Sequence, residues 1–205
     1  MAANADPPVE IVILDYNSPD DLQDYICDIA YSDHLVDDTI LTYRRYTGRD
    51  YYHMAHARNL SVMAAAGEYI VISSADIYPV VGFFAAVRDG LRIPNSFLYD
   101  HRYKGVMACR RVDFIAAGGY DERFEFYSPE DKDLHLRLLR RGQSGTIYPL
   151  DMVKVIETPN SEKIRNYRLQ ISKREMGQRM SHILNENIAN TALIANEGIE
   201  WGKWN

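Results

Sequence analysis

Blocks of apolar residues alternate with polar turns along the chain, and they predict buried strands that are followed by helices. Residues 10–14 form an apolar run that ends at Asp15, and residues 69–73 repeat this pattern before Ser74. A short run that is apolar on both faces is typical of a strand covered by helices on both sides. Residues 39–43 predict a further, half-polar strand. The pattern therefore indicates an α/β fold.

Helical spacing of apolar residues follows these strands. Ser18, Pro19 and the two aspartates after them are typical of a helix start, because serine caps a helix and acidic side chains favour its positive end. Further helices are expected over residues 50–66, 83–91, 128–141 and 161–187, and further strands over residues 105–109, at residue 147 and over residues 152–156. We expect one α/β domain over residues 9–205, with a central mixed, mostly parallel sheet flanked by helices and a long C-terminal helix.

Composition and charge narrow the class of protein. The 205 residues are 46% hydrophobic and 25% charged, as in ordinary globular proteins, and the net charge of −6 argues against nucleic acid as a partner. Cys27 and Cys109 are too few for a disulfide framework, so we predict a reducing, cytoplasmic location. Residues 1–8 are expected to form a disordered lead-in. No apolar run reaches the ~20 residues that cross a bilayer, which leaves peripheral membrane association open.

Polar residues stand directly after the two buried strands. Asp15, Tyr16 and Asn17 follow the first strand, and Ser74 and Asp76 follow the later one. Ligands of open α/β sheets bind at the carboxyl ends of the strands, so both groups are expected to line one cleft. Aspartate and asparagine also start turns and cap helices, and either group alone is compatible with that structural role.

Two further segments carry candidate chemistry. Arg58 lies in the predicted helix before the second strand, and its planar guanidinium suits a diphosphate, although an isolated helical arginine is usually solvated. His53 and His56 have a spacing compatible with a metal pair but lack a companion motif. Ser128 and Asp131 match a capping box, yet a carboxylate at a helix start that faces a cleft can also serve as a general base.

Together, these segments resemble the GT-A glycosyltransferases, in particular family 2-like enzymes and the galactosyltransferase-type C-terminal region. Residues 13–19 resemble the family's first strand and its Thr-Tyr-Asn turn. Residues 56–76 resemble its Ala-Arg-Asn helix, its Ala-Gly-Glu-Tyr step and its metal-binding Asp-x-Asp strand. Residues 118–124, with the Glu-Asp pair at 130–131, resemble its Gly-Gly-Phe-Asp-Glu and Glu-Asp segments. The resemblance covers about residues 10–150, and residues 36–38 are compared with the family's Asp-Asp-Gly-Ser strand end.

The resemblance implies an inverting, metal-dependent glycosyltransferase that moves a sugar from a nucleotide-sugar, with a UDP-sugar as the expected donor, to a hydroxyl of a glycan or glycoconjugate. Asp76 would hold Mn²⁺ or Mg²⁺ against the diphosphate, and Asp131 would take the proton of the acceptor. The residues expected at the donor are Asp15, Tyr16, Asn17, Arg58, Ser74 and Asp76.

The sequence departs from the family at the metal site. Ser74 stands where the family has its first acid, and the remaining ligands have no clear match beyond Glu157 and the remote His182. This departure supports an alternative, a non-catalytic GT-A-like module that binds sugar or nucleotide or serves in assembly. A nucleotidyltransferase would need a Gly-rich, basic phosphate loop after the first strand, and residues 15–19 are neither. The chain could also be one module of a longer protein.

Overall fold

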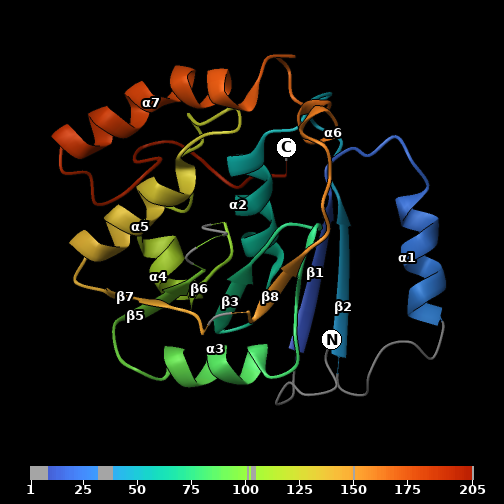
Figure 1. Ribbon diagram of the computed structural model, residues 1–205, viewed down its shortest axis with the longest axis horizontal. Helices are drawn as coiled ribbons and strands as arrows, with labels where there is room; N and C mark the ends of the chain where they lie inside the picture. The colour runs from blue at the N-terminus through green and yellow to red at the C-terminus, as the bar shows by residue number, and fades with distance from the viewer. Residues whose placement is uncertain (1–8, 32–38, 101, 103–104, 150, 205) are drawn as a thin grey trace.

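The computed structural model describes residues 9–31, 39–100, 102, 105–149 and 151–204. Within these ranges strands and helices alternate along the chain, and the sheets are flanked by helices (Figure 1). The expected lead-in over residues 1–8 and the segment 36–38 lie outside the described residues. None of the described helices is long and apolar enough to span a membrane.

The elements have the following bounds. The strands are β1 (Val9–Asp15), β2 (Thr39–Arg45), β3 (Tyr69–Ile72), β4 (Ile77–Pro79), β5 (Ser96–Tyr99), β6 (Met107–Arg110), β7 (Ser144–Ile147) and β8 (Val153–Val155). The helices are α1 (Leu22–Tyr31), α2 (Met54–Ala64), α3 (Phe83–Leu91), α4 (Arg111–Ala116), α5 (Glu130–Arg140), α6 (Asn160–Ile164) and α7 (Lys173–Ala189). The elements β4, β5 and α4 were not expected from the sequence.

The described strands form three sheets that contain both parallel and antiparallel pairs. β1 and β2 form a parallel pair, with Asp15 opposite Arg45 at its carboxyl end. A four-stranded sheet has the order β3-β6-β5-β7, in which β6 is antiparallel to both neighbours and β5 is parallel to β7. β4 and β8 form an antiparallel pair. The expected sheet was more parallel than this, because the short connection from β5 to β6 permits an antiparallel return that the sequence pattern did not show.

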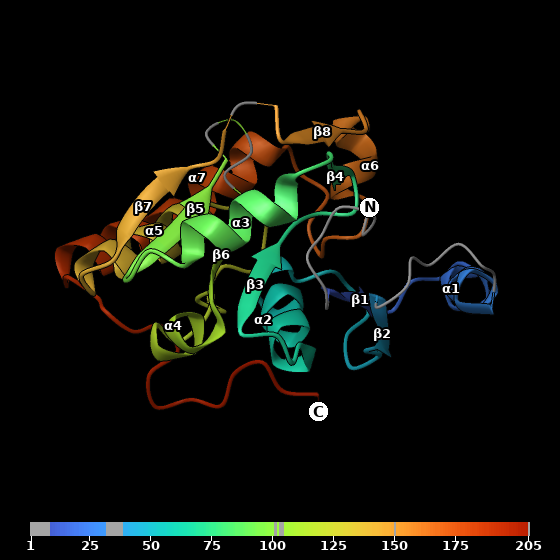
Figure 2. The ribbon, with the colours of Figure 1, turned by 90° about the horizontal axis from the view of Figure 1, so that it is seen from below.

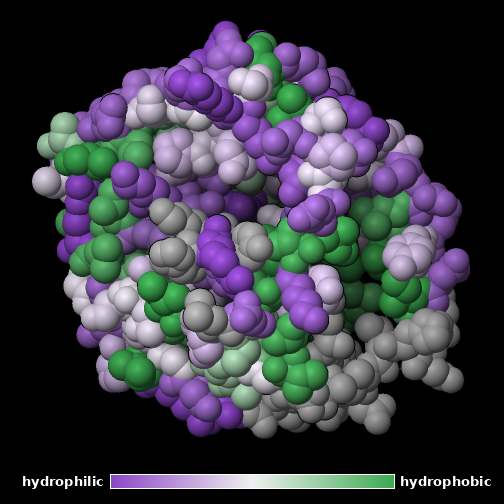
Figure 3. Space-filling model, viewed as in Figure 1, coloured by the Kyte–Doolittle hydropathy of each residue, from purple (hydrophilic) through white to green (hydrophobic). Residues whose placement is uncertain are grey.

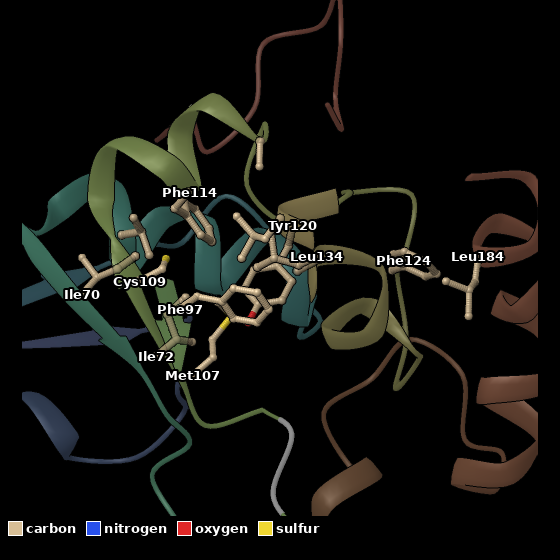
Figure 4. Packing of buried hydrophobic residues seen from close by; sticks show 14 of the residues in the cluster. Ile70, Ile72, Phe97, Met107, Cys109, Phe114, Tyr120, Phe124, Leu134 and Leu184 are labelled. Carbon is tan, nitrogen blue, oxygen red and sulfur yellow. The ribbon is translucent and has the colours of Figure 1, made fainter. Parts of the chain in front are cut away.

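The core explains why β3 is apolar on both of its faces. Ile70 and Ile72 pack into a cluster between β3, α2 and α5 (Figure 4). Val71 packs against a second cluster, which includes residues of α3. Figure 2 shows α2 and α3 on opposite sides of β3. The first cluster also contains Phe97, Met107, Cys109, Phe114, Tyr120, Phe124 and Leu134, all buried. The prediction of a strand covered on both sides is confirmed for β3, whereas the apolar side chains of β1 are only half-buried.

Two expected helix starts are wrong because nearby side chains hold the backbone in turns. α1 begins at Leu22, and Ser18 instead donates its backbone N–H to Asp15 Oδ1 at 2.7 Å. The expected capping box of α5 is absent too, since α5 begins at Glu130 without a side-chain cap, and Ser128 Oγ donates to Glu130 Oε2 at 2.8 Å. α2 begins four residues after the expected position 50, with His53 as its cap.

The helix expected over residues 161–187 is two helices, α6 and α7, separated by an irregular segment over residues 165–172. Ser172 starts α7 by accepting a hydrogen bond from the backbone N–H of Glu175 at 3.2 Å. Tyr167 in the segment is buried against Met54 and Met176. The break therefore follows from a second helix cap and a buried aromatic anchor, and it directs the segment toward β1.

Candidate functional site

A cleft of about 1230 Å³ opens beside the carboxyl ends of β1 and β3. Its walls come from β1 and the turn after it, the start of α1, the end of β2, residues 50–52, α2, the turn after β3, and α6 with the segment that follows. On the face shown in Figure 3, a recess with apolar residues lies between α1 and the β1–β2 pair. The predicted site residues that line the cleft are Tyr16, Asn17, Arg58 and Ser74. Asp15, Asp76 and Asp131 are not among the residues that line it.

Asp15 shapes the turn that carries Tyr16 and Asn17. Its side chain is buried and accepts hydrogen bonds from the Ser18 backbone N–H and from the Tyr43 hydroxyl, each at 2.7 Å. Asn17 has a φ of 58°, a left-handed conformation that asparagine tolerates, and its Nδ2 donates to the Arg49 carbonyl at 3.0 Å. The three residues come together as expected, with Asp15 behind the two that face the cleft.

Tyr16 joins a group of aromatic rings on the wall of the cleft. Its hydroxyl lies 2.7 Å from His56 Nδ1, and its ring is 4.9 Å from the ring of Tyr46. Burial raises the pKa of Tyr16, and burial also lowers the pKa of His56, so the phenol donates to a neutral imidazole. The wall therefore presents a fixed tyrosine ring to a ligand.

The two histidines of α2 do not form a metal pair. His53 Nδ1 accepts from the His56 backbone N–H, and His53 Nε2 lies 3.1 Å from the Glu122 carbonyl. His56 Nε2 lies 3.3 Å from the carbonyl of Lys203. Burial lowers the pKa of His53 to about 4, with a further contribution from Arg49. Both rings are used in hydrogen bonds that hold α2 to the rest of the chain.

Arg58 connects the cleft to a pair of carboxylates at the start of α5. Its Nη1 lies 2.9 Å from Glu130 Oε1 and 2.7 Å from Asp131 Oδ1. Tyr120 donates its hydroxyl to the same Asp131 oxygen at 3.1 Å, and its ring lies under the Arg58 guanidinium at 5.1 Å. The sequence places both Arg58 and Asp131 in the site, and the structure brings them into direct contact.

The two carboxylates have different environments. Burial, followed by the charge of Asp131, raises the pKa of Glu130 to about 8, so Glu130 holds its proton at neutral pH. The Glu130 side chain is 2% exposed and that of Asp131 is 17% exposed. Within the described residues, Asp131 Oδ2 makes no hydrogen bond; it faces Gly105, where an added Cβ would lie 3.3 Å away. Asp131 is thus the more accessible carboxylate of the pair.

The expected metal ligand, Asp76, forms an ion pair with Lys163. Asp76 Oδ2 accepts a hydrogen bond from Lys163 Nζ, and the two side chains are 23% and 28% exposed. Within the described residues, no group of three or more His, Cys, Asp or Glu side chains could hold a metal ion. Glu157 and His182 do not join Asp76 in such a group, and His182 Nδ1 instead faces the Arg179 carbonyl at 2.7 Å. One carboxylate already neutralised by a lysine does not fit a resident metal ion.

The cleft gathers positive charge in an acidic protein. The charged residues that line it are Arg45, Arg58, Lys163, Arg165, Arg168, Asp50 and Glu162, so five are cationic and two are anionic. The whole chain has a net charge of −6. The sequence pattern did not predict that residues 163–168 line the cleft, because it placed them inside one long helix. The Ser172-x-x-Glu175 capping box was the signal that a new helix starts there.

Comparisons with known proteins agree with this fold. A family model described as the N-terminal domain of galactosyltransferase matches residues 95–166, which include Asp131 and Lys163. No curated protein matches the chain by sequence. A mannosyltransferase from Pyrobaculum calidifontis, solved in complex with GDP-Man and Mn²⁺, is similar with a TM-score of 0.51 and 18% identity over 71% of this chain. The chain spans 55% of the length of that structure.

A second solved structure is the catalytic domain of Drosophila beta1,4-galactosyltransferase 7 in complex with xylobiose. It has a TM-score of 0.50 and 14% identity, and the similarity covers 82% of this chain and 79% of the Drosophila chain. Identities this low show the fold alone. The predicted resemblance to GT-A glycosyltransferases and the predicted α/β class are confirmed at the level of the fold.

Proposed function

We propose that this chain is an inverting glycosyltransferase that transfers a sugar from a nucleoside-diphosphate sugar to a hydroxyl of a glycan or glycoconjugate. The observation that carries the proposal is the contact between Arg58 and Asp131. Arg58 lines the cationic cleft, and its Nη1 lies 2.7 Å from Asp131, so an anion site and a candidate base adjoin each other. The GT-A fold supports the same assignment. A UDP-sugar donor and a cytoplasmic location remain our predictions.

The donor would lie in the cleft with its diphosphate toward the cationic wall. Arg45, Lys163 and Arg168 supply positive charge there, which stabilises the charge that develops on the leaving nucleotide. Tyr16 and Asn17, held by the buried Asp15, would contact the nucleoside. Ser74 would contact the diphosphate through its hydroxyl or its backbone.

Asp131 would act as the general base. The acceptor oxygen attacks the anomeric carbon, its proton moves to Asp131 Oδ2, and the bond to the phosphate oxygen breaks with its electron pair on the nucleotide. Attack from the face opposite the leaving group inverts the anomeric configuration. Arg58 and Tyr120 hold Asp131 Oδ1, which leaves Oδ2 for the proton.

The test is the variant Asp131→Asn, assayed with a panel of UDP- and GDP-sugars and glycan acceptors. Asparagine keeps an acceptor for Arg58 while it removes basicity, so we expect transfer to fall by roughly 10²- to 10⁴-fold with donor affinity nearly unchanged. Asp24→Asn is the matched control, because Asp24 lies in the first turn of α1 and is exposed. Parental transfer by Asp131→Asn would disprove this role. Nucleotide binding without any transfer by the parent would favour the alternative of a non-catalytic GT-A-like binding module.

A further inference from the structure

The pair formed by Lys163 and Asp76 occupies the position where the family resemblance places a metal ion. The Lys163 ammonium lies on Asp76 Oδ2, and Lys163 also lines the cleft. An ammonium group has three N–H donors, so two remain for a ligand when one is directed at Asp76. In this pair, the ammonium group of Lys163 lines the cleft, and the carboxylate of Asp76, which does not line it, contacts that ammonium group.

The backbone around Lys163 is fixed by contacts with α2 and the segment before it. The Tyr52 backbone N–H donates to the Asn166 carbonyl at 2.6 Å, and the rings of Tyr52 and Tyr167 meet edge to face at 5.4 Å. Tyr167 is buried and its hydroxyl points at Met54 Sδ. The segment that follows Lys163 is therefore held in place by tertiary contacts, and these position Lys163 at the cleft.

The residues that follow Lys163 in the chain carry further positive charge. Arg165 and Arg168 line the same cleft, on the segment that follows Lys163. Burial, together with the nearby charge of Lys163, lowers the pKa of Lys173, so Lys173 also lies close to this group. Lys163, Arg165 and Arg168 thus outnumber the two carboxylates of this region, Asp76, which Lys163 contacts, and Glu162, which lines the cleft beside it. Such a site attracts an anion such as a diphosphate more strongly than a divalent cation.

We infer that Lys163 supplies the positive charge that holds the donor diphosphate, with Asp76 orienting its ammonium group, so that nucleotide binding does not require a divalent metal ion. This inference rests on the proposed function, because it assumes a nucleoside-diphosphate ligand in the cleft. A metal ion at Asp76 would have to displace the ammonium of Lys163. Ser74 fits this arrangement, since a second acid at that position would leave a negative charge facing the diphosphate.

The experiment is calorimetric titration of metal-stripped protein with UDP and with GDP, in EDTA and in Mn²⁺. We expect the parent to bind one of them with affinities that agree within about threefold between the two conditions. Lys163→Ala should weaken binding in EDTA by about tenfold or more, since it removes a charge-assisted hydrogen bond to phosphate. The same variant frees Asp76, so its affinity should now rise with Mn²⁺, and adding Asp76→Asn should abolish that rise.

Lys154→Ala is the matched control, because Lys154 is an exposed lysine of β8 that does not line the cleft. It removes the same charge from the protein and should bind nucleotide like the parent. Binding that needs Mn²⁺ in the parent, together with parental affinity in Lys163→Ala, would overturn the inference and leave the proposed function intact. Failure of the parent to bind either nucleotide in both conditions would overturn both.

Discussion

Replacing Glu130 by glutamine tests the electrostatics of the candidate site without a substrate. Glu130 is buried, and its pKa is raised from an ordinary 4.5 to about 8 by burial and by the adjacent charge of Asp131. Glutamine has the shape of the protonated acid. Its carbonyl can accept from Arg58 Nη1, as Glu130 Oε1 does at 2.9 Å, and its amide can donate to Ser128 Oγ. We therefore expect Glu130→Gln to fold.

The sign of the pH dependence follows from the raised pKa. Between about pH 4.5 and pH 8 the folded chain retains a proton on Glu130 that the unfolded chain has released. The free energy of unfolding of the parent therefore falls as the pH rises through this window, by at most about 1.4 kcal/mol per pH unit from this group. Glutamine has no proton to release. Relative to the parent, the variant should gain up to roughly 4 kcal/mol between about pH 5 and pH 9.

The assay is chemical unfolding of the parent and the variant at several pH values in that range, with the difference in unfolding free energy as the readout. Taking the difference cancels every other titrating group that the two proteins share. Glu157→Gln, at an exposed position outside the cleft, is the control and should give a difference that does not change with pH. If the difference in unfolding free energy between Glu130→Gln and the parent also stays constant with pH, the pKa of Glu130 is not raised. The conclusion that Glu130 and Asp131 differ in protonation would then be wrong.

The sequence predicted the parts of the fold that local pattern determines. β1, β2 and β3 lie where the apolar runs predicted strands, although only β3 buries apolar side chains fully, and α3 has the expected bounds over residues 83–91. β4 and β5 were missed because each is only three or four residues long, and β4 pairs with β8 and β5 with β7, both far along the chain. Such strands carry little periodicity of their own.

The sequence predicted several residues that line the cleft but not the ion pairs that these residues form. Tyr16, Asn17, Arg58 and Ser74 line one cleft, as their positions at strand ends and on α2 indicated. The partner of Arg58 was not predictable from local pattern, because Glu130 is 72 residues away and a planar guanidinium suits a carboxylate as well as a diphosphate.

Lys163 was not predicted as a site residue because the local sequence pattern was misleading there. A pattern of apolar residues at helical spacing ran through it, and tertiary contacts of Tyr167 and a new cap at Ser172 overrode that pattern. A basic residue on the polar side of a long amphipathic helix would be solvated. Because the helix breaks after residue 164, Lys163 lines the cleft instead. Its position depends on tertiary packing, which the local sequence pattern does not predict.

Two more substitutions probe the Arg58 ion pair. Arg58→Ala removes the cation that pairs with Asp131 and donates to the buried Glu130, and it should destabilise the fold by about 2–3 kcal/mol in chemical unfolding, whereas Arg92→Ala, at a side chain that is 65% exposed, should cost under about 0.5 kcal/mol. Gly105→Ala puts a Cβ 2.8 Å from Arg58 Nη2, too close for both to stay in place, so the guanidinium of Arg58 must shift. We expect lower sugar transfer, because the methyl group displaces Arg58 and with it Asp131, while Lys163, Arg165 and Arg168 of the cleft wall stay in place. Gly177→Ala in α7 has open space at its Cβ and should keep parental transfer, so equal rates in the two alanine variants would show that the pair does not position the base.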